Sequence, residues 1–407
     1  NIYTLQSNPV WALRNDLGTI EGIHSDYVEN ADREALMIIE VDLLSEREIE
    51  ELQRELTLVL DDVSAVVDSF DPMRMRLELL IAELKTNAPK VEQLDESLAF
   101  LQWIYDGYFV FTGCAEFDLE VKDESVYLRE KTSSAYGLLK KYRGDLRKES
   151  VEELSDGVKG LYEEDQILTV TKSAKRSKVH RNVYSDYIVV KRFNSDGDPV
   201  GEIRFLGLYT AQFYSYSPRR IPILREKVGW VMENSGFNPA SHDGKALLTI
   251  LDSHPRDELL HVTREVLAAT AIGVWQIYER RVVKVFVHTD PFNKFVSCLV
   301  YLPRESFNTN TRDKIEEKIG LELGAVESEL TTHFIPDSVL VRIRLVYKIE
   351  NKKYLEVNAE TLQAVVEKIT RSWSDVFSEQ SISALGEADG AVLSRRFQNA
   401  FPSAYQE

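Results

Sequence analysis

Residues 282–308, VVKVFVHTDPFNKFVSCLVYLPRESFN, constrain the fold more than any other stretch of this chain. Two apolar runs rich in β-branched and aromatic residues flank the turn-forming sequence DPFN at 290–293, which is typical of two paired strands. A helix opened by TNT at 309–311 is expected to follow. From residue 281 to about 380 the predicted order is strand, strand, helix, strand, strand, helix. The strands are expected at 282–288, 295–302, 325–334 and 339–349, and the helices at 311–323 and 360–377.

The first 88 residues predict strands followed by one long helix. Strands are expected at 10–13, 18–24 and 36–41, and Ser45 with Glu48 has the pattern of a capping box. The apolar residues of the helix are spaced three and four apart, which predicts one buried stripe. They are Ile49, Leu52, Leu56, Val59, Leu60, Val63, Val66, Val67 and Phe70. The dipeptide DP at 71–72 is expected to break the helix, which then continues to about Leu84.

Residues 89–235 predict an antiparallel sheet. After a helix near 94–105, strands are expected at 109–119, 125–128, 167–171, 188–193, 200–206 and 212–216. The sequence NSDG at 194–197 strongly indicates a hairpin between two of these strands. With helices expected on one side, the region looks more like a PAS-type sensor sheet than a dinucleotide-binding fold.

Residues 218–281 predict helices that connect the two sheets. Pro222 is expected to open the first, Ser241 to cap the second, and Pro255 to lie in the first turn of a third whose apolar residues run from Leu259 to Trp275. One more polar helix is expected over 386–405, ending at Pro402.

These patterns predict a multidomain α+β protein. Its strand and helix order resembles ACT-like, ferredoxin-like α/β sandwiches that flank a central antiparallel-sheet, PAS-like domain. The expected parts are a truncated ACT-like module at 1–88, the central sheet with helices at 89–235, a helical connector at 236–280, a second ACT-like module at 281–380, and a C-terminal helix at 381–407 that leads toward a downstream region.

The composition of the chain limits the kinds of partner that it can bind and the cellular compartment in which it is expected. A formal charge of −18 over 407 residues opposes broad contact with nucleic acid or an anionic membrane. No apolar run approaches the roughly 20 residues that span a bilayer. Cys114 and Cys298 each lie in an apolar run, so both are expected to be buried and inert. Two cysteines this far apart are no disulfide framework, which fits the reducing cytoplasm. The chain begins at Asn1 without a methionine and stops at Glu407, which suggests a fragment.

No catalytic, cofactor-binding or metal-binding residue can be nominated from the sequence. A Gly-x-Gly fingerprint, a phosphate-binding P-loop and a Gly-x-Ser-x-Gly elbow are all absent. His254 lies near two acids, and His261 precedes Glu265 by four residues, but neither has the two-histidine spacing of zinc enzymes. The favoured interpretation of the His261–Glu265 pair is a surface hydrogen bond. The sequence HDGK at 242–245 is interpreted as a helix start.

One basic island interrupts this acidic chain. It comprises Lys172, Lys175, Arg176, Lys178, Arg181, Lys191 and Arg192, with Asp186 as the single acid among them. It could receive an anionic ligand or an acidic partner. The preferred interpretation is a solvated strand face paired with the acidic stretch 149–165. The sequence SPRR at 217–220 could lie nearby and hold a carboxylate with its two arginines.

Long strings of the chain closely resemble the large bacterial NAD-dependent glutamate dehydrogenases, near their N-terminus. They include GYFVFTGCAEFDL (107–119), LTVTKSAKRSKVHR (168–181), GEIRFLGLYT (201–210), SPRRIPILREKV (217–228), SHDGKALL (241–248), HPRDEL (254–259) and DPFNKFVSCLVYLPRESFNT (290–309). The resemblance extends in a consistent order over nearly the whole chain.

The resemblance implies a parent enzyme that converts L-glutamate, NAD and water into 2-oxoglutarate, ammonia and NADH. In that family the catalytic residues and the NAD site lie in a downstream domain, so no catalytic residue is transferred here and no cofactor is expected in this fragment. The implied role is regulation and assembly of a homo-oligomer, with an L-amino acid as effector. The loop 303–308 lacks the glycine that effector-binding ACT modules commonly keep, which puts binding at that loop in doubt.

Two other functions remain open. One is a stand-alone amino-acid-sensing protein built from ACT-like modules, which the downstream reading frame would distinguish. The other is a binding module centred on the basic island.

Overall fold

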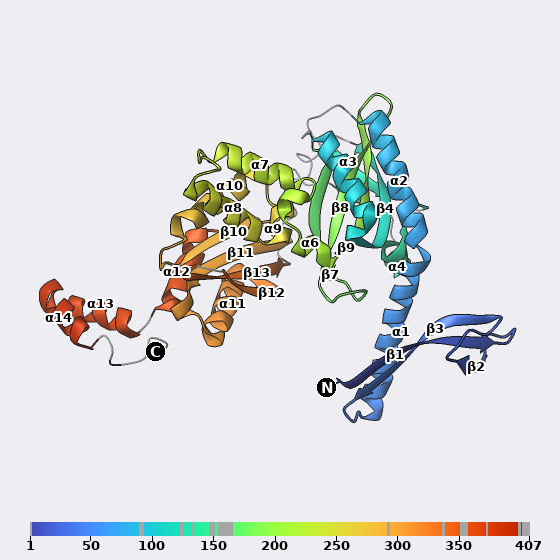
Figure 1. The fold of residues 1–407 in the computed structure, drawn as a ribbon, viewed down its shortest axis with the longest axis horizontal. Helices are drawn as coiled ribbons and strands as arrows, with labels where there is room; N and C mark the ends of the chain where they lie inside the picture. Colours follow the sequence, from blue (N-terminus) through green and yellow to red (C-terminus); the bar gives the residue numbers. More distant parts are fainter. Residues whose placement is uncertain are drawn as a thin grey trace. The chain divides into compact units, whose positions relative to one another are not determined.

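The computed structural model describes residues 2–88, 93–122, 125–131, 133–145, 151–153, 166–290, 294–335, 338–350, 357–371, 373–397 and 400. Among these the chain forms two compact units, one up to Asp61 and one from Asp62 onward. The predicted mixture of helices and several antiparallel sheets is confirmed (Figure 1). No helix of the described segments is long and apolar enough to span a membrane.

The first unit contains a three-stranded antiparallel sheet and most of a long helix. Its strands are β1 (Ile2–Arg14), β2 (Ile20–His24) and β3 (Ala31–Val41), in the order β2-β1-β3. Helix α1 (Glu46–Asp68) begins at the predicted capping box. The backbone amide of Ser45 donates to Glu48 Oε2 at 2.8 Å, and the Glu48 amide donates to Ser45 Oγ at 3.4 Å. These bonds satisfy amides that a helix start leaves free.

The predicted buried stripe of α1 is wrong over its first half. Ile49, Leu52 and Leu56 are 43%, 40% and 45% exposed, and of the nine stripe residues only Val66, near the end of the helix, is buried. Regular apolar spacing fixes which residues share a helix face, but burial also needs a surface to cover that face. The three-stranded sheet does not supply one.

The second unit begins with a six-stranded antiparallel sheet in the order β6-β5-β4-β9-β8-β7. Its strands are β4 (Phe109–Lys122), β5 (Ser125–Glu130), β6 (Val151–Glu153), β7 (Leu168–Arg176), β8 (Tyr184–Phe193) and β9 (Pro199–Tyr209). The predicted hairpin turn joins β8 to β9, with Gly197 at φ +87° and the Asn194 side chain accepting the amides of Asp196 and Asp198.

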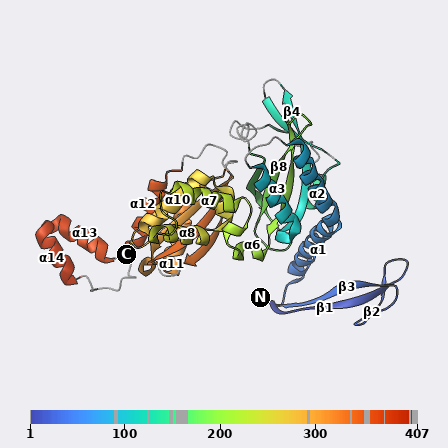
Figure 2. The same ribbon diagram turned by 45° about the horizontal axis from the view of Figure 1, so that its top comes forward.

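Helices lie on both faces of this sheet rather than on one. Helices α2 (Phe70–Asn87) and α3 (Leu94–Trp103) lie side by side on the face that carries Phe205 (Figure 2). Helix α4 (Gly137–Asp145) packs on the opposite face, where Leu206 meets Leu138. Neighbouring residues of a strand point to opposite faces, so both faces of β9 are apolar and need cover. A single turn of π-helix, η1 (Ile104–Tyr108), leads from α3 into β4.

The predicted strand at 212–216 is a short helix, α6 (Ala211–Ser215). Alternating aromatic and polar residues suggested a strand, but only Phe213 is buried there, and its ring stacks on Tyr209 at 4.2 Å between centroids. The turn of α6, which begins just after β9 ends at Tyr209, brings Phe213 back onto that ring. A 3₁₀ turn, η2 (Pro218–Arg220), follows.

The helical segment contains four helices where three were expected. They are α7 (Leu224–Asn234), α8 (His242–Ser253), α9 (Arg256–His261) and α10 (Arg264–Ile277). Ser241 caps α8 as predicted, accepting the Gly244 amide at 3.1 Å. The predicted third helix is divided at Val262 because Thr263 caps a new helix, accepting the amide of Val266 at 3.3 Å.

The second sheet of this unit follows the predicted element order. Strands β10 (Lys284–Thr289), β11 (Phe295–Pro303), β12 (Ala325–Phe334) and β13 (Leu340–Ile349) lie in the order β10-β11-β13-β12, with the turn η3 (Arg304–Ser306) and helices α11 (Thr309–Leu323) and α12 (Ala359–Thr370). The predicted helix 360–377 is instead divided into α12 and α13 (Trp373–Leu385), and α14 (Glu387–Phe397) completes the described helices. The 291–293 part of the predicted turn and Pro402 lie outside the described residues.

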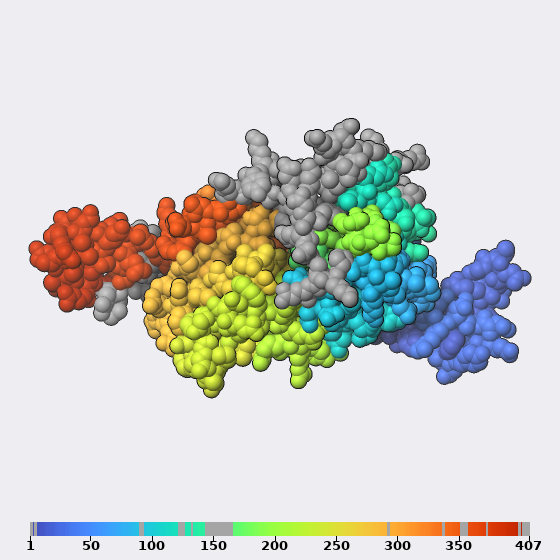
Figure 3. Space-filling view, turned by 90° about the horizontal axis from the view of Figure 1, so that it is seen from above, coloured from blue at the N-terminus to red at the C-terminus, as the bar shows by residue number. Residues whose placement is uncertain are grey.

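One apolar core joins the two sheets of the second unit. It extends from α2 and α3 through the six-stranded sheet and helices α7 to α10 to Leu299, Tyr301 and Leu340 of the second sheet. Figure 3 shows the yellow-green to yellow surface of the helical segment running between the cyan of α3 and the orange of the second sheet region. Both cysteines are buried as predicted, and burial raises the pKa of the Cys114 thiol to about 12.

A methyl group at Gly207 should destabilise the second unit. A Cβ there would overlap the carbonyl oxygen of Val110 on the neighbouring strand and the ring of Phe109. We expect Gly207→Ala to lower the free energy of unfolding by about 1–3 kcal/mol, measured by urea denaturation. The matched control is Gly229→Ala in α7, where a Cβ meets no atom within 4 Å, and which should be neutral or slightly stabilising. An equal effect of both substitutions would contradict the close strand approach.

Candidate functional site: a buried charge network on helix α9

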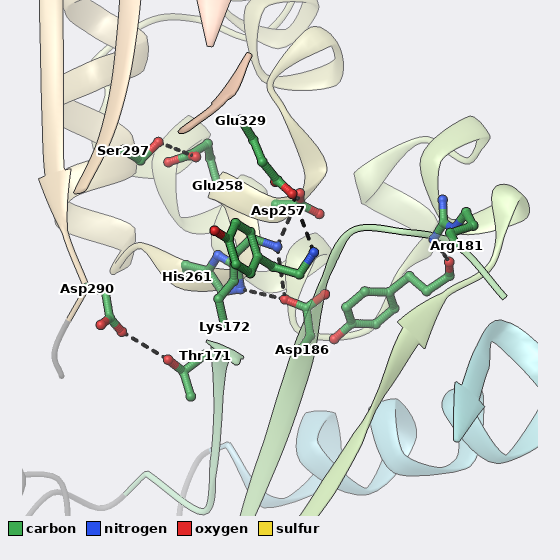
Figure 4. A network of polar contacts seen from close by, with 12 residues as sticks. Thr171, Lys172, Arg181, Asp186, Asp257, Glu258, His261, Asp290, Ser297 and Glu329 are labelled. Atoms are coloured by element: carbon green, nitrogen blue, oxygen red, sulfur yellow. Dashed lines mark hydrogen bonds and ion pairs between the residues drawn. The ribbon is translucent and has the colours of Figure 1, made fainter. Parts of the chain in front are cut away.

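Helix α9 lies between the six-stranded sheet and the second sheet and carries charged side chains toward both. Pro255 precedes it with φ −55°, which suits the residue that leads into a helix. Asp257 and Glu258 occupy its first turn, and His261 ends it. Figure 4 shows these side chains meeting Lys172 and Asp186 from the six-stranded sheet and Ser297 from the second sheet.

The first half of the network binds α9 to strands β7 and β8. Lys172 and Asp186 are direct cross-strand partners, and Lys172 Nζ lies 3.4 Å from Asp186 Oδ1 and 3.7 Å from Asp257 Oδ2. His261 Nε2 lies 3.2 Å from Asp186 Oδ1. The side chains of Lys172 and Asp186 are only 8% and 3% exposed, so water does not screen this pairing as it does a surface ion pair.

The second half binds α9 to strands β11 and β13. The hydroxyl of Ser297 donates to Glu258 Oε1 at 2.5 Å, and Arg344 Nε donates to the same oxygen at 3.0 Å. Arg344 also reaches Asp257, with NH2 3.4 Å from Oδ2. One arginine therefore connects both acids of the helix to the second sheet.

The pKa shifts follow from competition between burial and pairing. Burial raises the pKa of Asp257, but Lys172 and Arg344 outweigh it and hold that pKa well below its usual range. Burial likewise raises the pKa of Glu258, and Arg344 with Ser297 lowers it overall. For Lys172, burial lowers the pKa while Asp186 and Asp257 raise it above its usual value. All three groups are therefore ionised at neutral pH.

Lys227 of α7 fixes the other end of α9. Its Nζ donates to the carbonyl oxygens of Leu259, Leu260 and Val262 at 3.0, 3.0 and 2.8 Å. These carbonyls end the helix and have no intrahelical partner, so the ammonium replaces the missing donors. Burial lowers the pKa of Lys227 to about 8.

Two small cavities border the network. One of about 30 Å³ is lined by residues that include Lys172, Glu258, His261 and Ser297. The other, of about 20 Å³, is lined by His254, Glu258, His288, Ser297 and apolar side chains. A buried water occupies a space of this order, and an amino acid or a nucleotide does not fit. The described residues also contain no cluster of three or more His, Cys, Asp or Glu that could hold a metal ion.

The basic island forms the solvated face that the sequence suggested only in part, since Lys175 and Lys178 are exposed but others are paired within the fold. Lys172 is buried in the network, and Arg176 pairs with Glu327 and, at 3.1 Å, with Glu329 of β12. Arg192 lies 2.7 Å from Asp118. The acidic stretch 149–165, proposed as its partner, lies outside the described residues except for 151–153, whose side chains are not described.

His261 and the SPRR sequence also have partners within the fold. His261 meets Asp186 in the network rather than Glu265 on the surface, because the helix ends between His261 and Glu265. In SPRR, Arg219 NH2 lies 3.1 Å from Asp252 Oδ2 and the hydroxyl of Ser217 donates to the same carboxylate at 2.9 Å.

Sequence reasoning missed Arg344, Ser297 and Lys227. Arg344 had a detectable signal, since it is one of three cations, with Arg342 and Lys348, in the largely apolar strand β13, LVRIRLVYKI. Ser297 and Lys227 had none, because their roles depend on which elements pack together.

Three family models match this chain. "Glutamate dehydrogenase, ACT2 domain" matches residues 284–374, "Glutamate dehydrogenase, helical motif 1" matches 221–280, and "Glutamate dehydrogenase, helical motif 2" matches 382–407. The first two contain the second sheet and helices α7 to α10, so both contribute charges to the network. These models make the chain similar to segments of glutamate dehydrogenases.

Curated relatives make the family more specific. The NAD-specific glutamate dehydrogenase of Halomonas elongata is 38% identical over 385 residues, covering 92% of this chain and 23% of the relative. The Pseudomonas aeruginosa protein of the same name is 32% identical over 412 residues, covering 100% of this chain and 25% of the relative. The protein of the same name from Mycobacterium tuberculosis is 25% identical over 374 residues, covering 87% of this chain and 22% of the relative. The chain belongs to the NAD-specific glutamate dehydrogenase family and spans about a quarter of the length of these relatives.

Removing one cation from the network should be costly. Lys172→Met leaves Asp186 and Asp257 buried without their shared partner, so we expect the free energy of unfolding to fall by about 3–5 kcal/mol in urea denaturation. The control is Arg281→Met, which breaks an exposed pair with Glu305 and should cost no more than about 1 kcal/mol. Similar losses for the two variants would contradict a desolvated network.

The imidazole of His254 should make the protein less stable in mild acid. Burial, with a smaller effect of Arg342, lowers the pKa of His254 to about 3, against about 6.5 in the unfolded chain. Between these values the unfolded state binds more protons, so stability falls as the pH decreases, by up to about 1.4 kcal/mol per pH unit.

Urea denaturation from pH 6.5 to 4.5 measures this contribution. His254→Leu should flatten the dependence of stability on pH, whereas His242→Leu, at an exposed helix start, should leave it unchanged. The same slope in His254→Leu as in the native sequence would show that His254 is not responsible.

Proposed function

We propose that this chain is a non-catalytic regulatory and oligomerisation region of an NAD-dependent glutamate dehydrogenase. The parent enzyme, a cytoplasmic oxidoreductase, would convert L-glutamate, NAD and water into 2-oxoglutarate, ammonia and NADH, with NAD bound outside this region. The names of the relatives support the parent reaction, and the share of their length that the chain spans leaves room for a separate catalytic domain.

The observation that carries the regulatory role is the buried charge network on α9, the joint between the two sheets of the second unit. Asp257 and Glu258 bind, through Lys172, Ser297 and Arg344, two sheets that are far apart in sequence. A ligand or a partner chain that moves either sheet must disturb charges that cannot be left unpaired. The joint can therefore transmit a change at one sheet to the other as a shift between two packed arrangements.

The second sheet supports the assembly role. The ACT2 family match covers β10 to α12, and we interpret this part as an ACT-like module. Its outermost strands are β10 and β12, and an outermost strand offers backbone hydrogen-bonding groups to another chain. Pairing between copies at such a strand would build a homo-oligomer, and an L-amino acid bound at this module is the proposed effector.

A thermal-shift panel with L-amino acids, 2-oxoglutarate and NADH tests the proposal. We expect one L-amino acid to stabilise the 407-residue chain and NADH to leave it unchanged, since a ligand at about a hundred times its Kd adds about 2.7 kcal/mol. The D-enantiomer is the control. The chain should form no NADH from glutamate and NAD, and NADH formation would overturn the non-catalytic assignment. A flat panel together with a monomer in sedimentation would remove both proposed roles.

A further inference from the structure

Arg342 of β13 is a buried cation without an acidic partner. It is only 6% exposed, whereas Arg344, two residues later on the same strand, pairs with Glu258 at 3.0 Å. Among the residues that the structure describes, no acidic side chain forms a hydrogen bond or an ion pair with Arg342. Buried charges in proteins are normally paired, because removing a lone charge from water is costly. The counter-charge of Arg342 is therefore missing from the described fold.

The fold directs Arg342 toward the start of α9. Residues two apart on a strand point to the same face of the sheet, so Arg342 shares its face with Arg344, which reaches both acids in the first turn of α9. Its direct cross-strand neighbours on that face are Tyr301 of β11 and His333 of β12. Burial raises the pKa of Tyr301, against the charge of Arg342 and a hydrogen bond between the two side chains. The hydroxyl of Tyr301 is therefore neutral and does not balance the guanidinium.

A second guanidinium, that of Arg256, lies beside the first and also lacks an acidic partner. Its Nε and NH2 donate to the carbonyl oxygen of Tyr216 at 3.2 and 3.0 Å, and its NH1 donates to that of His254 at 2.9 Å. These acceptors are uncharged backbone groups. Burial lowers the pKa of Arg256, Asp252 raises it, and the charge of Arg342 lowers it again. The two guanidinium groups thus repel each other where water screens charges poorly.

The acids that act on this region are already engaged by other cations. Glu258 Oε1 accepts from Arg344 at 3.0 Å, and Asp252 Oδ2 lies 3.1 Å from NH2 of Arg219. His254 supplies no negative charge, because burial, with a smaller effect of Arg342, holds its pKa low and leaves the ring neutral. The region beside Arg342 and Arg256 is therefore positive once the pairs printed in the fold are formed.

An anion from solution can supply the missing charge. Water can accept the N–H groups of Arg342, but it carries no opposing charge. A guanidinium group donates up to five hydrogen bonds in one plane and binds carboxylates and other small anions well. The low exposure of Arg342 leaves no room for a bulky ligand.

We propose that Arg342, with Tyr301 and Arg256, forms a binding site for a small monovalent anion, either chloride or a carboxylate of the size of formate. Arg342 binds the anion directly, the Tyr301 hydroxyl donates to it, and the charge of Arg256 adds attraction. The anion holds β13 of the second sheet against the start of α9. This site goes beyond the proposed function and does not depend on it.

The first test uses the native 407-residue chain at constant ionic strength, with sodium gluconate replaced stepwise by sodium chloride. Gluconate is the reference, since its anion is too bulky for the site. We expect a saturable excess broadening of the ³⁵Cl NMR line and a rise in Tm with chloride over gluconate. Added formate distinguishes the two ligands: loss of the broadening identifies a site that takes carboxylates, and unchanged broadening a site for chloride. Equal Tm values in gluconate, chloride and formate, without excess broadening, would overturn the proposal.

Substitutions then locate the site. Arg342→Met should weaken chloride binding by about tenfold or more, since it removes hydrogen bonds to a charged ligand. In gluconate this variant should be at least as stable as the native chain, because it removes a charge without a partner. The control, Arg281→Met, removes an exposed arginine and should bind like the native chain.

A second variant keeps the test decisive if Arg342→Met does not fold. Tyr301→Phe retains both guanidinium groups and removes only one hydroxyl, so it should bind chloride more weakly than the native chain. Native chloride binding in Tyr301→Phe and Arg342→Met alike would overturn the site. So would an Arg342→Met variant that loses the same stability in gluconate as in chloride, because Arg342 would then have its partner within the fold.

Discussion

The arrangement of the second unit depends on the buried charges of α9, which must all be paired once they are removed from water. Taking a carboxylate or an ammonium group into a protein interior costs several kcal/mol for each ion, and only complete pairing offsets that cost. Asp257 and Glu258 find such pairing only where β7, β8, β11 and β13 all approach α9. The network therefore penalises any arrangement in which one sheet separates from the helix, even though it contributes little net stability of its own.

Hydrophobic packing and the charge network have complementary roles. The shared apolar core, with Phe205 on one sheet and Leu299 and Tyr301 on the other, supplies most of the stabilisation because it is large and non-directional. The charges are directional, so they specify one relative placement of the two sheets. Lys227 adds a further constraint by holding the last carbonyls of the short helix that carries them.

Local sequence patterns predicted most strands and helix caps, because these depend on neighbours in sequence. Ser45 with Glu48, Ser241, and the turn at Asn194 to Gly197 are examples in which side chains satisfy nearby amides. The errors occur where tertiary packing decides. The apolar face of α1 lacks a covering surface, so most of it is exposed. Residues 212–216 are helical rather than extended, and this places Phe213 on the ring of Tyr209.

The candidate site was less predictable than the fold for the same reason. Lys172, Asp186, Asp257 and Glu258 were visible in the sequence, but as a basic island and as acids near His254. Their pairing requires β7 to pack against α9, because Lys172 and Asp257 are about eighty positions apart in the sequence. Family resemblance identified the class of protein, whereas the joint itself became visible only in three dimensions.

Native-state hydrogen exchange would test most directly whether the two sheets form one cooperative body. The account predicts that the slowest amides of β8 and of β13 exchange with the same opening free energy and the same dependence on urea, because one core and one network hold both strands. A lower opening free energy for β13, with its own smaller dependence on urea, would show that the second sheet opens alone. That result would contradict the coupling through α9.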